Sequence, residues 1–220
     1  MKKKQDNKGR FRTAVSYQAI LLGISTLIAT TMLSFANLAT KDAIALRIEE
    51  DLKASISQVV PEDIYDNDLL QDALTVKDAV GADMTVYRAQ LNGVITAVIF
   101  EVRENGYSGV IRSIMAVAPD GTTLGARILA HAETPGLGDK IEIAKDDWVL
   151  GFNGRSLGDP GRSAWAVKKD GGEFDQFTGA TITPRAVVKS IKGGLEFFEQ
   201  ERQLLLVPVT GTEGDAGDED

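Results

Sequence analysis

The sequence predicts an α+β protein, in which a single N-terminal transmembrane helix precedes one domain with an antiparallel sheet and flanking helices. Three observations predict this fold class. An uncharged apolar segment lies near the N-terminus, several β-type segments separated by turn residues occupy the middle, and apolar residues at helical spacing close the chain. The 220 residues suffice for one globular domain with extensions.

The composition excludes several classes of function. The chain has no cysteine, which excludes disulfides, thiolate metal sites and cysteine nucleophiles. A single histidine, His131, excludes a histidine cluster, and the net charge of −8 argues against nucleic-acid binding. We therefore expect no metal site and no nucleic-acid partner.

Residues 17–39 carry no formal charge and are predicted to form the transmembrane helix. As a helix, this segment spans about 34 Å, enough for the lipid bilayer core of about 30 Å. Residues 1–16 are basic, so the positive-inside rule places them in the cytoplasm and the later domain outside. For a Gram-negative bacterium this means an inner-membrane protein with a periplasmic domain. The alternative is a signal peptide cleaved near Ser34-Phe35-Ala36, but the apolar segment is long for one.

Residues 40–80 are expected to form a stalk and linker between the anchor and the domain. Ile44, Ile48, Leu52 and Ile56 recur at four-residue spacing, which predicts an amphipathic helix that Pro61 ends. A second, short helix is expected near Leu69 to Leu74.

Residues 81–209 are expected to form the folded domain. Strands are predicted at 84–90, 94–102, 110–118 and 122–130, with Asn92-Gly93 as a hairpin turn. A helix at 139–150, a strand at 163–168 and a closing helix at 184–202 should follow. Gly193-Gly194 would weaken the last helix or mark a close approach to the sheet. Residues 210–220 form an acidic, glycine-rich tail that we expect to be disordered.

Two loops carry the candidate site. In the first, 175–185, Thr181 and Thr183 are candidate helix N-caps, and the start of the helix after Gly179 suits a phosphate or another anion. Arg185 could pair with such a phosphate or lie in solvent. In the second, 131–140, two glycines and Pro135 give an irregular loop with exposed N–H groups, where His131 is more often a structural partner than a base. Each loop alone is also compatible with an ordinary cap or turn.

Together, the two loops resemble a known family. Asp175, Thr178, Gly179, Ala180 and Thr181 match the flavinylation signature Asp-x-x-(Ser/Thr)-Gly-Ala-Thr. The second loop reads Glu-Thr-Pro-Gly-Leu-Gly at Glu133, Thr134, Pro135, Gly136, Leu137 and Gly138. With the basic tip, the anchor and the closing helix, the chain resembles the G subunit of the Rnf (Rsx) electron-transport complex. The C subunit of the sodium-translocating NADH:quinone reductase is a sister family with both motifs.

This resemblance implies an FMN-binding domain and an electron-carrier role in an ion-translocating complex of several membrane subunits. It makes Thr181 the residue that carries FMN through a phosphoester bond. The two motifs and Thr183 would surround the cofactor. A threonine hydroxyl needs a base or metal to become a nucleophile, and none is evident near Thr181, so the resemblance implies an external flavin transferase that recognises Asp175.

Two other interpretations are open. One is a membrane-tethered binding module with no redox role, in which the threonine motif is only a helix start. The other is a hydrolase built on Asp139, Asp175 or Glu133, for which no partner base is visible. We assign no catalytic residue to the chain and expect it to act as part of a redox-driven translocase.

Overall fold

The computed structural model describes residues 3–78 and 81–207, so the predicted acidic tail at 210–220 lies outside the described residues. The chain divides into two compact units between Leu52 and Lys53. Helix α1, Lys3–Ser57, begins in the first unit and ends in the second. Its segment Tyr17–Lys41, 25 residues with a mean hydropathy of 1.9, is long and apolar enough to cross a membrane.

The second unit contains one five-stranded antiparallel sheet in the simple order β1-β2-β3-β4-β5. Its strands are β1 Leu74–Lys77, β2 Asp83–Leu91, β3 Val94–Asn105, β4 Val110–Val117 and β5 Thr123–Ala130. The four predicted strands correspond to β2 through β5. Asn92 and Gly93 turn β2 into β3 with positive φ values of 52° and 77°, as the hairpin prediction required.

One expectation at the start of this unit is wrong. The helix predicted near Leu69 to Leu74 is absent; the segment forms turns and then the short edge strand β1. Thr75 and Lys77 are exposed, and β1 is stabilised by pairing with β2. The sequence of a four-residue segment does not show such pairing, so the strand could not be predicted from it.

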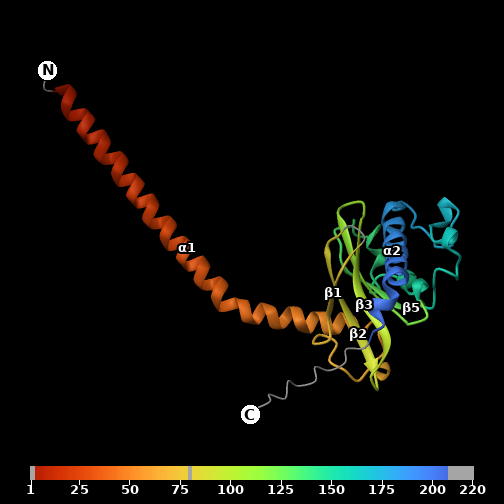
Figure 1. Cartoon of the computed structure of the whole chain (residues 1–220). Helices are drawn as coiled ribbons and strands as arrows, with labels where there is room; N and C mark the ends of the chain where they lie inside the picture. The colour runs from red at the N-terminus through yellow and green to blue at the C-terminus, as the bar shows by residue number, and fades with distance from the viewer. Residues whose placement is uncertain (1–2, 79–80, 208–220) are drawn as a thin grey trace, which may run out of the picture. The chain divides into compact units, whose positions relative to one another are not determined.

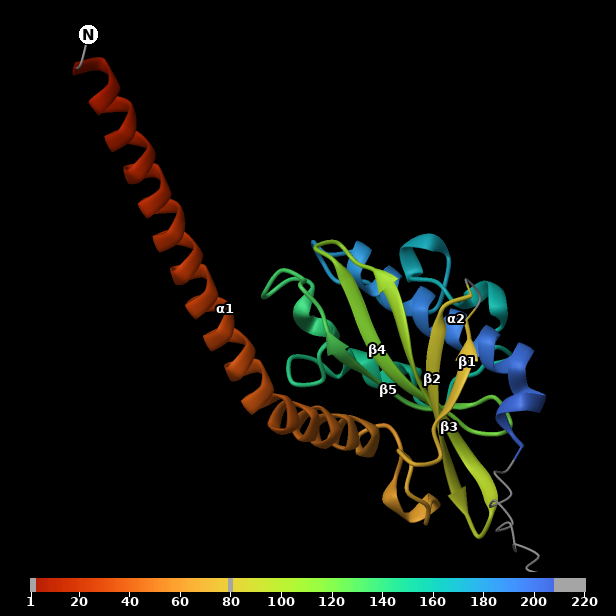
Figure 2. The same ribbon diagram turned by 60° about the vertical axis from the view of Figure 1, so that its left-hand side comes forward.

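Helix α2, Ile182–Leu205, packs along one face of the sheet, against β3 and β4 (Figure 1; Figure 2). Its predicted apolar stripe, Val187, Ile191, Leu195 and Phe198, is fully buried. Gly194 lies at the closest approach, because a Cβ there would stand 2.4 Å from Met115 Sδ and 2.8 Å from Val102 Cγ1. The fold class, with its antiparallel sheet and flanking helices, is as predicted.

Residues 131–181, between β5 and α2, are irregular, and two predictions there are wrong. In place of a helix at 139–150 there are two short 3-10 helices, η2 Asp139–Ile141 and η3 Asp147–Phe152. In place of a strand at 163–168 there are η4 Arg162–Ala164 and η5 Lys168–Asp170. A cluster of aromatic rings stabilises this backbone: Trp148, Phe152, Trp165, Phe174 and Phe177.

Candidate functional site

The first motif forms a tight turn before α2. Ala180 N–H donates to Phe177 O at 3.2 Å, and the same two residues form an isolated β-bridge. Gly179 sits between them at φ +84°, a conformation that side-chain-bearing residues rarely adopt. Thr178 and Gly179 are exposed at the tip of this turn, so an enzyme acting on the protein can reach them.

Thr181 immediately precedes α2, but its hydroxyl does not cap the helix. Its backbone is already helical (φ −75°, ψ −28°), and its side chain makes no hydrogen bond to any residue that the structure describes. Thr183 does not cap either, because its hydroxyl donates to Glu133 Oε2. Both predicted capping roles are therefore wrong. The N–H groups of Ile182 and Thr183 have no acceptor in the described part of the chain, and Pro184 has no N–H.

The second motif is a turn that begins at a buried carboxylate. Leu137 N–H and Gly138 N–H both donate to Thr134 O, at 3.1 and 3.0 Å, and Gly136 has a φ of +76°. Thr134, Pro135, Gly136 and Leu137 are exposed at this turn. Glu133, in contrast, is only 4% exposed.

Three segments meet at Glu133. Its Oε1 accepts from Ser108 N–H at 2.9 Å, its Oε2 accepts from the Thr183 hydroxyl, and its own N–H donates to His131 Nδ1 at 3.0 Å. Since Nδ1 accepts this bond, Nε2 carries the imidazole proton and donates to Glu142 Oε1 at 2.6 Å. His131 is thus a structural partner of the loop.

The two motifs lie in contact, although Glu133 and Thr183 are 50 residues apart. A Cβ on Gly138 would stand 2.9 Å from Thr183 Oγ1, and a Cβ on Gly179 would stand 3.5 Å from Leu137 Cδ2. A glycine at 138 is therefore required for the loop to approach the start of α2 this closely. The structure brings together what the sequence places in two separate loops.

The charged residues near the first motif are already paired. Arg185 donates two hydrogen bonds to Asp170, at 2.6 and 2.8 Å, and these bonds lower the pKa of the Asp170 carboxyl. Asp175 is exposed, its carboxylate lies 2.7 Å from Lys168 Nζ, and its carbonyl accepts from Trp148 Nε1 at 2.8 Å. A phosphate bound by Arg185 would thus compete with an existing ion pair.

Several residues of this site carry no signal in the sequence. Ser108 lies in a loop whose sequence is that of an ordinary turn, yet its N–H holds Glu133. A Cβ on Gly106 would stand 2.5 Å from Glu133 Oε1. Ile182 lies outside both motifs, but it is 44% exposed next to Thr181, while Leu137 is 43% exposed in the other loop. Exposed apolar side chains beside a motif can indicate a binding site, but their exposure is known only from the structure.

Comparison with known proteins identifies the family of the domain that contains both motifs. Residues 106–196, which contain both motifs, match the family described as the FMN-binding domain. A curated relative from Cereibacter sphaeroides, the G subunit of the ion-translocating oxidoreductase complex, is 56% identical over 190 residues, covering 86% of this chain and 87% of that protein. The protein of the same name from Stutzerimonas stutzeri is 46% identical over 193 residues, covering 88% and 84%.

A solved structure is also similar. The crystal structure of Shewanella oneidensis NqrC aligns with a TM-score of 0.47 and 25% sequence identity, over 66% of this chain and 73% of that chain.

The match of residues 106–196 assigns the chain to the class of proteins with an FMN-binding domain. Within that class, the chain belongs to the family formed by the G subunits of ion-translocating oxidoreductase complexes, as the resemblance predicted.

Proposed function

We propose that the protein is an electron-carrier subunit of a membrane-bound, ion-translocating electron-transport complex, and that its FMN is attached to Thr181 by a phosphoester bond. The contact between the two motifs carries this proposal. At this contact Gly179 lies next to the exposed apolar side chain of Leu137, and Thr181, whose hydroxyl makes no hydrogen bond among the described residues, follows two residues later at the start of α2.

The residues at Thr181 fit a phosphate. The N–H groups of Ile182 and Thr183 lie in the first turn of a 24-residue helix, whose positive dipole end favours an anion. The tight turn at Gly179 keeps side-chain bulk away from this end. The Thr181 hydroxyl makes no internal bond among the described residues, so a bond to phosphorus would cost no existing contact.

The chain's own residues would position the cofactor. FMN supplies the redox chemistry when it is bound. Leu137 and Ile182 offer apolar surface for the flavin ring, and Glu133 and Thr183 keep the two loops at a fixed separation. Thr178, Gly179 and Ala180 shape the turn, while Thr134, Pro135, Gly136 and Gly138 shape the facing loop.

Attachment requires a separate enzyme. The Thr181 hydroxyl has no base within hydrogen-bond distance among the described residues, so we assign its activation to a flavin transferase. Asp175 is exposed in the segment that leads into α2, and its carbonyl is held by Trp148, which suits recognition by such an enzyme.

The proposed setting is the bacterial inner membrane. Residues 17–39 would remain as the anchor, residues 1–16 would be cytoplasmic, and the FMN domain, 81–209, would be periplasmic after the stalk at 40–80. Its partners would be the other membrane subunits of the complex, since the names of the relatives describe those proteins as parts of a complex.

The test is in-gel flavin fluorescence after full denaturation. The unchanged protein, Thr181→Ala and the control Thr75→Ala, at an exposed threonine of β1 outside both motifs, are each produced together with a flavin transferase. A fluorescent band for the unchanged protein and the control, with a dark Thr181→Ala band, is expected. A dark band for the unchanged protein with an active transferase would favour the membrane-tethered, non-redox module instead.

A further inference from the structure

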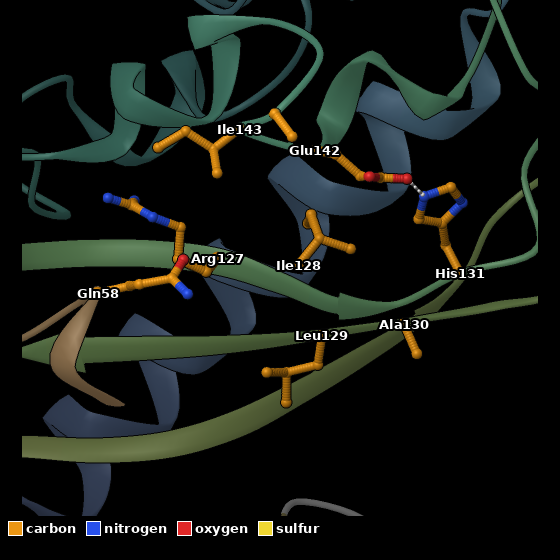
Figure 3. Close-up of a pocket in the computed structure, with 9 residues that line it drawn as sticks. Gln58, Arg127, Ile128, Leu129, Ala130, His131, Glu142 and Ile143 are labelled. Carbon is orange, nitrogen blue, oxygen red and sulfur yellow. Dashed lines mark hydrogen bonds and ion pairs between the residues drawn. The ribbon is translucent and has the colours of Figure 1, made fainter. Parts of the chain in front are cut away.

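A cavity of about 360 Å³ lies along strand β5, and no residue of the Thr181 motif lines it. Five consecutive residues, 127–131, form one side, residues 142–144 form the other, and Gln58 lies at one end (Figure 3). Since the last four residues of β5 and His131 after them line it, the cavity follows the end of the strand and is elongated. We call it the β5 slot.

Most of the backbone along the β5 slot has no partner outside the sheet among the described residues, although the Ala126 carbonyl accepts from Arg127. β5 is an edge strand, and alternate residues of an edge strand direct their N–H and C=O groups away from the sheet. Thr123, at the start of β5, is paired on this side with residues 154 and 155. Beyond it, no backbone group of 124–130 bonds to a described backbone group outside the sheet.

Arg127 gives the slot an uncompensated positive charge. Its Nε is buried without a hydrogen-bond partner in the described chain, and Nη1 reaches only the carbonyl of Ala126, at 2.7 Å. No described carboxylate forms an ion pair with it, and burial lowers its pKa. Glu142, the acid in the slot, is already bonded to His131. Of the two charged side chains in the slot, Arg127 is therefore the one that has no side-chain partner among the described residues.

Apart from Gln58 at one end, the remaining lining residues are apolar. Ile143 is 39% exposed, and Figure 3 shows it above the strand, on the same side as Ile128. Because Ile143 is exposed and faces the strand edge, an apolar side chain of a ligand would be favoured between Ile143 and β5. The slot thus offers backbone pairing, apolar contact and one cation.

We infer that the β5 slot is the docking site for an extended, acidic segment of another subunit of the complex, which adds to the sheet beside β5 and pairs a carboxylate with Arg127. This inference rests on the proposed function for the existence of that complex. An extended peptide matches an elongated slot along a free edge. A second copy of this chain fits less well, because antiparallel pairing of two β5 edges would bring the two Arg127 cations together.

The docking site is connected to the flavin loop. Glu142, in the slot, is bonded to His131, and His131 accepts the N–H of Glu133. A segment docked beside β5 would therefore contact Glu142, which is linked through His131 to Glu133, the residue that joins the two motifs. This places a neighbouring subunit close to the proposed cofactor.

The test is site-specific photocrosslinking in the assembled complex. A photoreactive phenylalanine analogue replaces Ile143 in the full-length chain, the membranes are illuminated, and the attached peptides are mapped by mass spectrometry. We expect attachment to an extended, Asp- or Glu-containing segment of another subunit. Arg127→Glu should lower the yield by about tenfold or more, since it places like charges together.

Lys77→Glu is the matched control, because it reverses an exposed cation on β1, the opposite edge strand. It should leave the yield unchanged. Attachment only to this chain or to lipid, no attachment at all, or a yield for Arg127→Glu within about twofold of the unchanged protein would overturn the inference. Flavin fluorescence of the same bands is read separately, so a dark band with normal crosslinking would count against the proposed function alone.

Discussion

Glu133 joins three segments of the domain through one side chain. Its carboxylate accepts from Ser108 N–H and from the Thr183 hydroxyl, and it is 4% exposed. A buried carboxylate must have its hydrogen bonds satisfied, so losing either partner costs more than the bond itself contributes. The separation of the two flavin loops therefore depends on this residue.

Glu133→Met and Thr183→Val should each lower the free energy of unfolding by about 1–3 kcal/mol. The double variant should lose less than the sum, because both changes remove the same bond. Urea denaturation of the three variants measures this. Thr178→Val, at an exposed threonine of the same motif, is the control and should change stability by less than about 0.5 kcal/mol. Strictly additive losses would contradict the shared bond.

At this scale the sequence names candidate site residues but does not predict the contacts between them. Glu133 and Thr183 both lie in or beside the motifs, but nothing in their spacing pairs them, because the chain must first fold through an irregular segment. The capping role assigned to Thr183 is wrong because the buried Glu133 competes for its hydroxyl. The role assigned to Thr181 is wrong because its backbone is already helical, whereas a capping residue has an extended backbone.

At the scale of elements, α2 approaches the sheet closely because one of its residues has no side chain. Gly194 faces Met115, Val102 and Phe100, whereas a Cβ on the adjacent Gly193 would meet nothing within 4 Å. The two neighbouring glycines therefore have different roles: the first only weakens the helix, and the second permits its approach.

Gly194→Ala should destabilise the domain by about 1–3 kcal/mol, since Val102 and Met115 would have to move in a packed core. Gly193→Ala should instead stabilise it by up to about 1 kcal/mol through helix propensity. Thermal unfolding of the matched pair measures both. Equal effects of the two substitutions would contradict the packing of α2 on β3 and β4.

The spacing of apolar residues in the sequence predicts those helices and strands that bury one of their own faces in the core. β2 to β5 and α2 are of this kind. Residues 131–181 are different, because ring contacts such as Trp165 with Phe174 stabilise short 3-10 helices that have no repeating pattern. The sequence therefore could not predict the backbone on which the first motif rests.

At the scale of the whole molecule, the folded unit begins inside α1. Ile56, Val59 and Val60 are 1–2% exposed, and a Cβ on Gly125 of β5 would stand 3.0 Å from the backbone of Val59. The end of the predicted stalk therefore contributes to the core of the second unit.

A fragment that starts at Lys53 should stay folded, whereas one that starts at Pro61 should be less stable. The shorter fragment loses three buried apolar side chains, each contributing about 1.5–3 kcal/mol. Its Tm should fall by about 5 °C or more. Circular dichroism during heating compares the two, and equal Tm values would show that residues 53–60 do not stabilise the domain.

The central claim is that Thr181 carries the flavin, and peptide mass spectrometry tests it most directly. Trypsin should release residues 170–185 as one peptide that contains Thr178, Thr181 and Thr183. From protein produced with a flavin transferase, we predict this peptide with the mass of FMN added through its phosphate, and fragmentation that locates the addition at Thr181. An addition at Thr178 or Thr183, or an unmodified peptide despite active transferase, would contradict the claim.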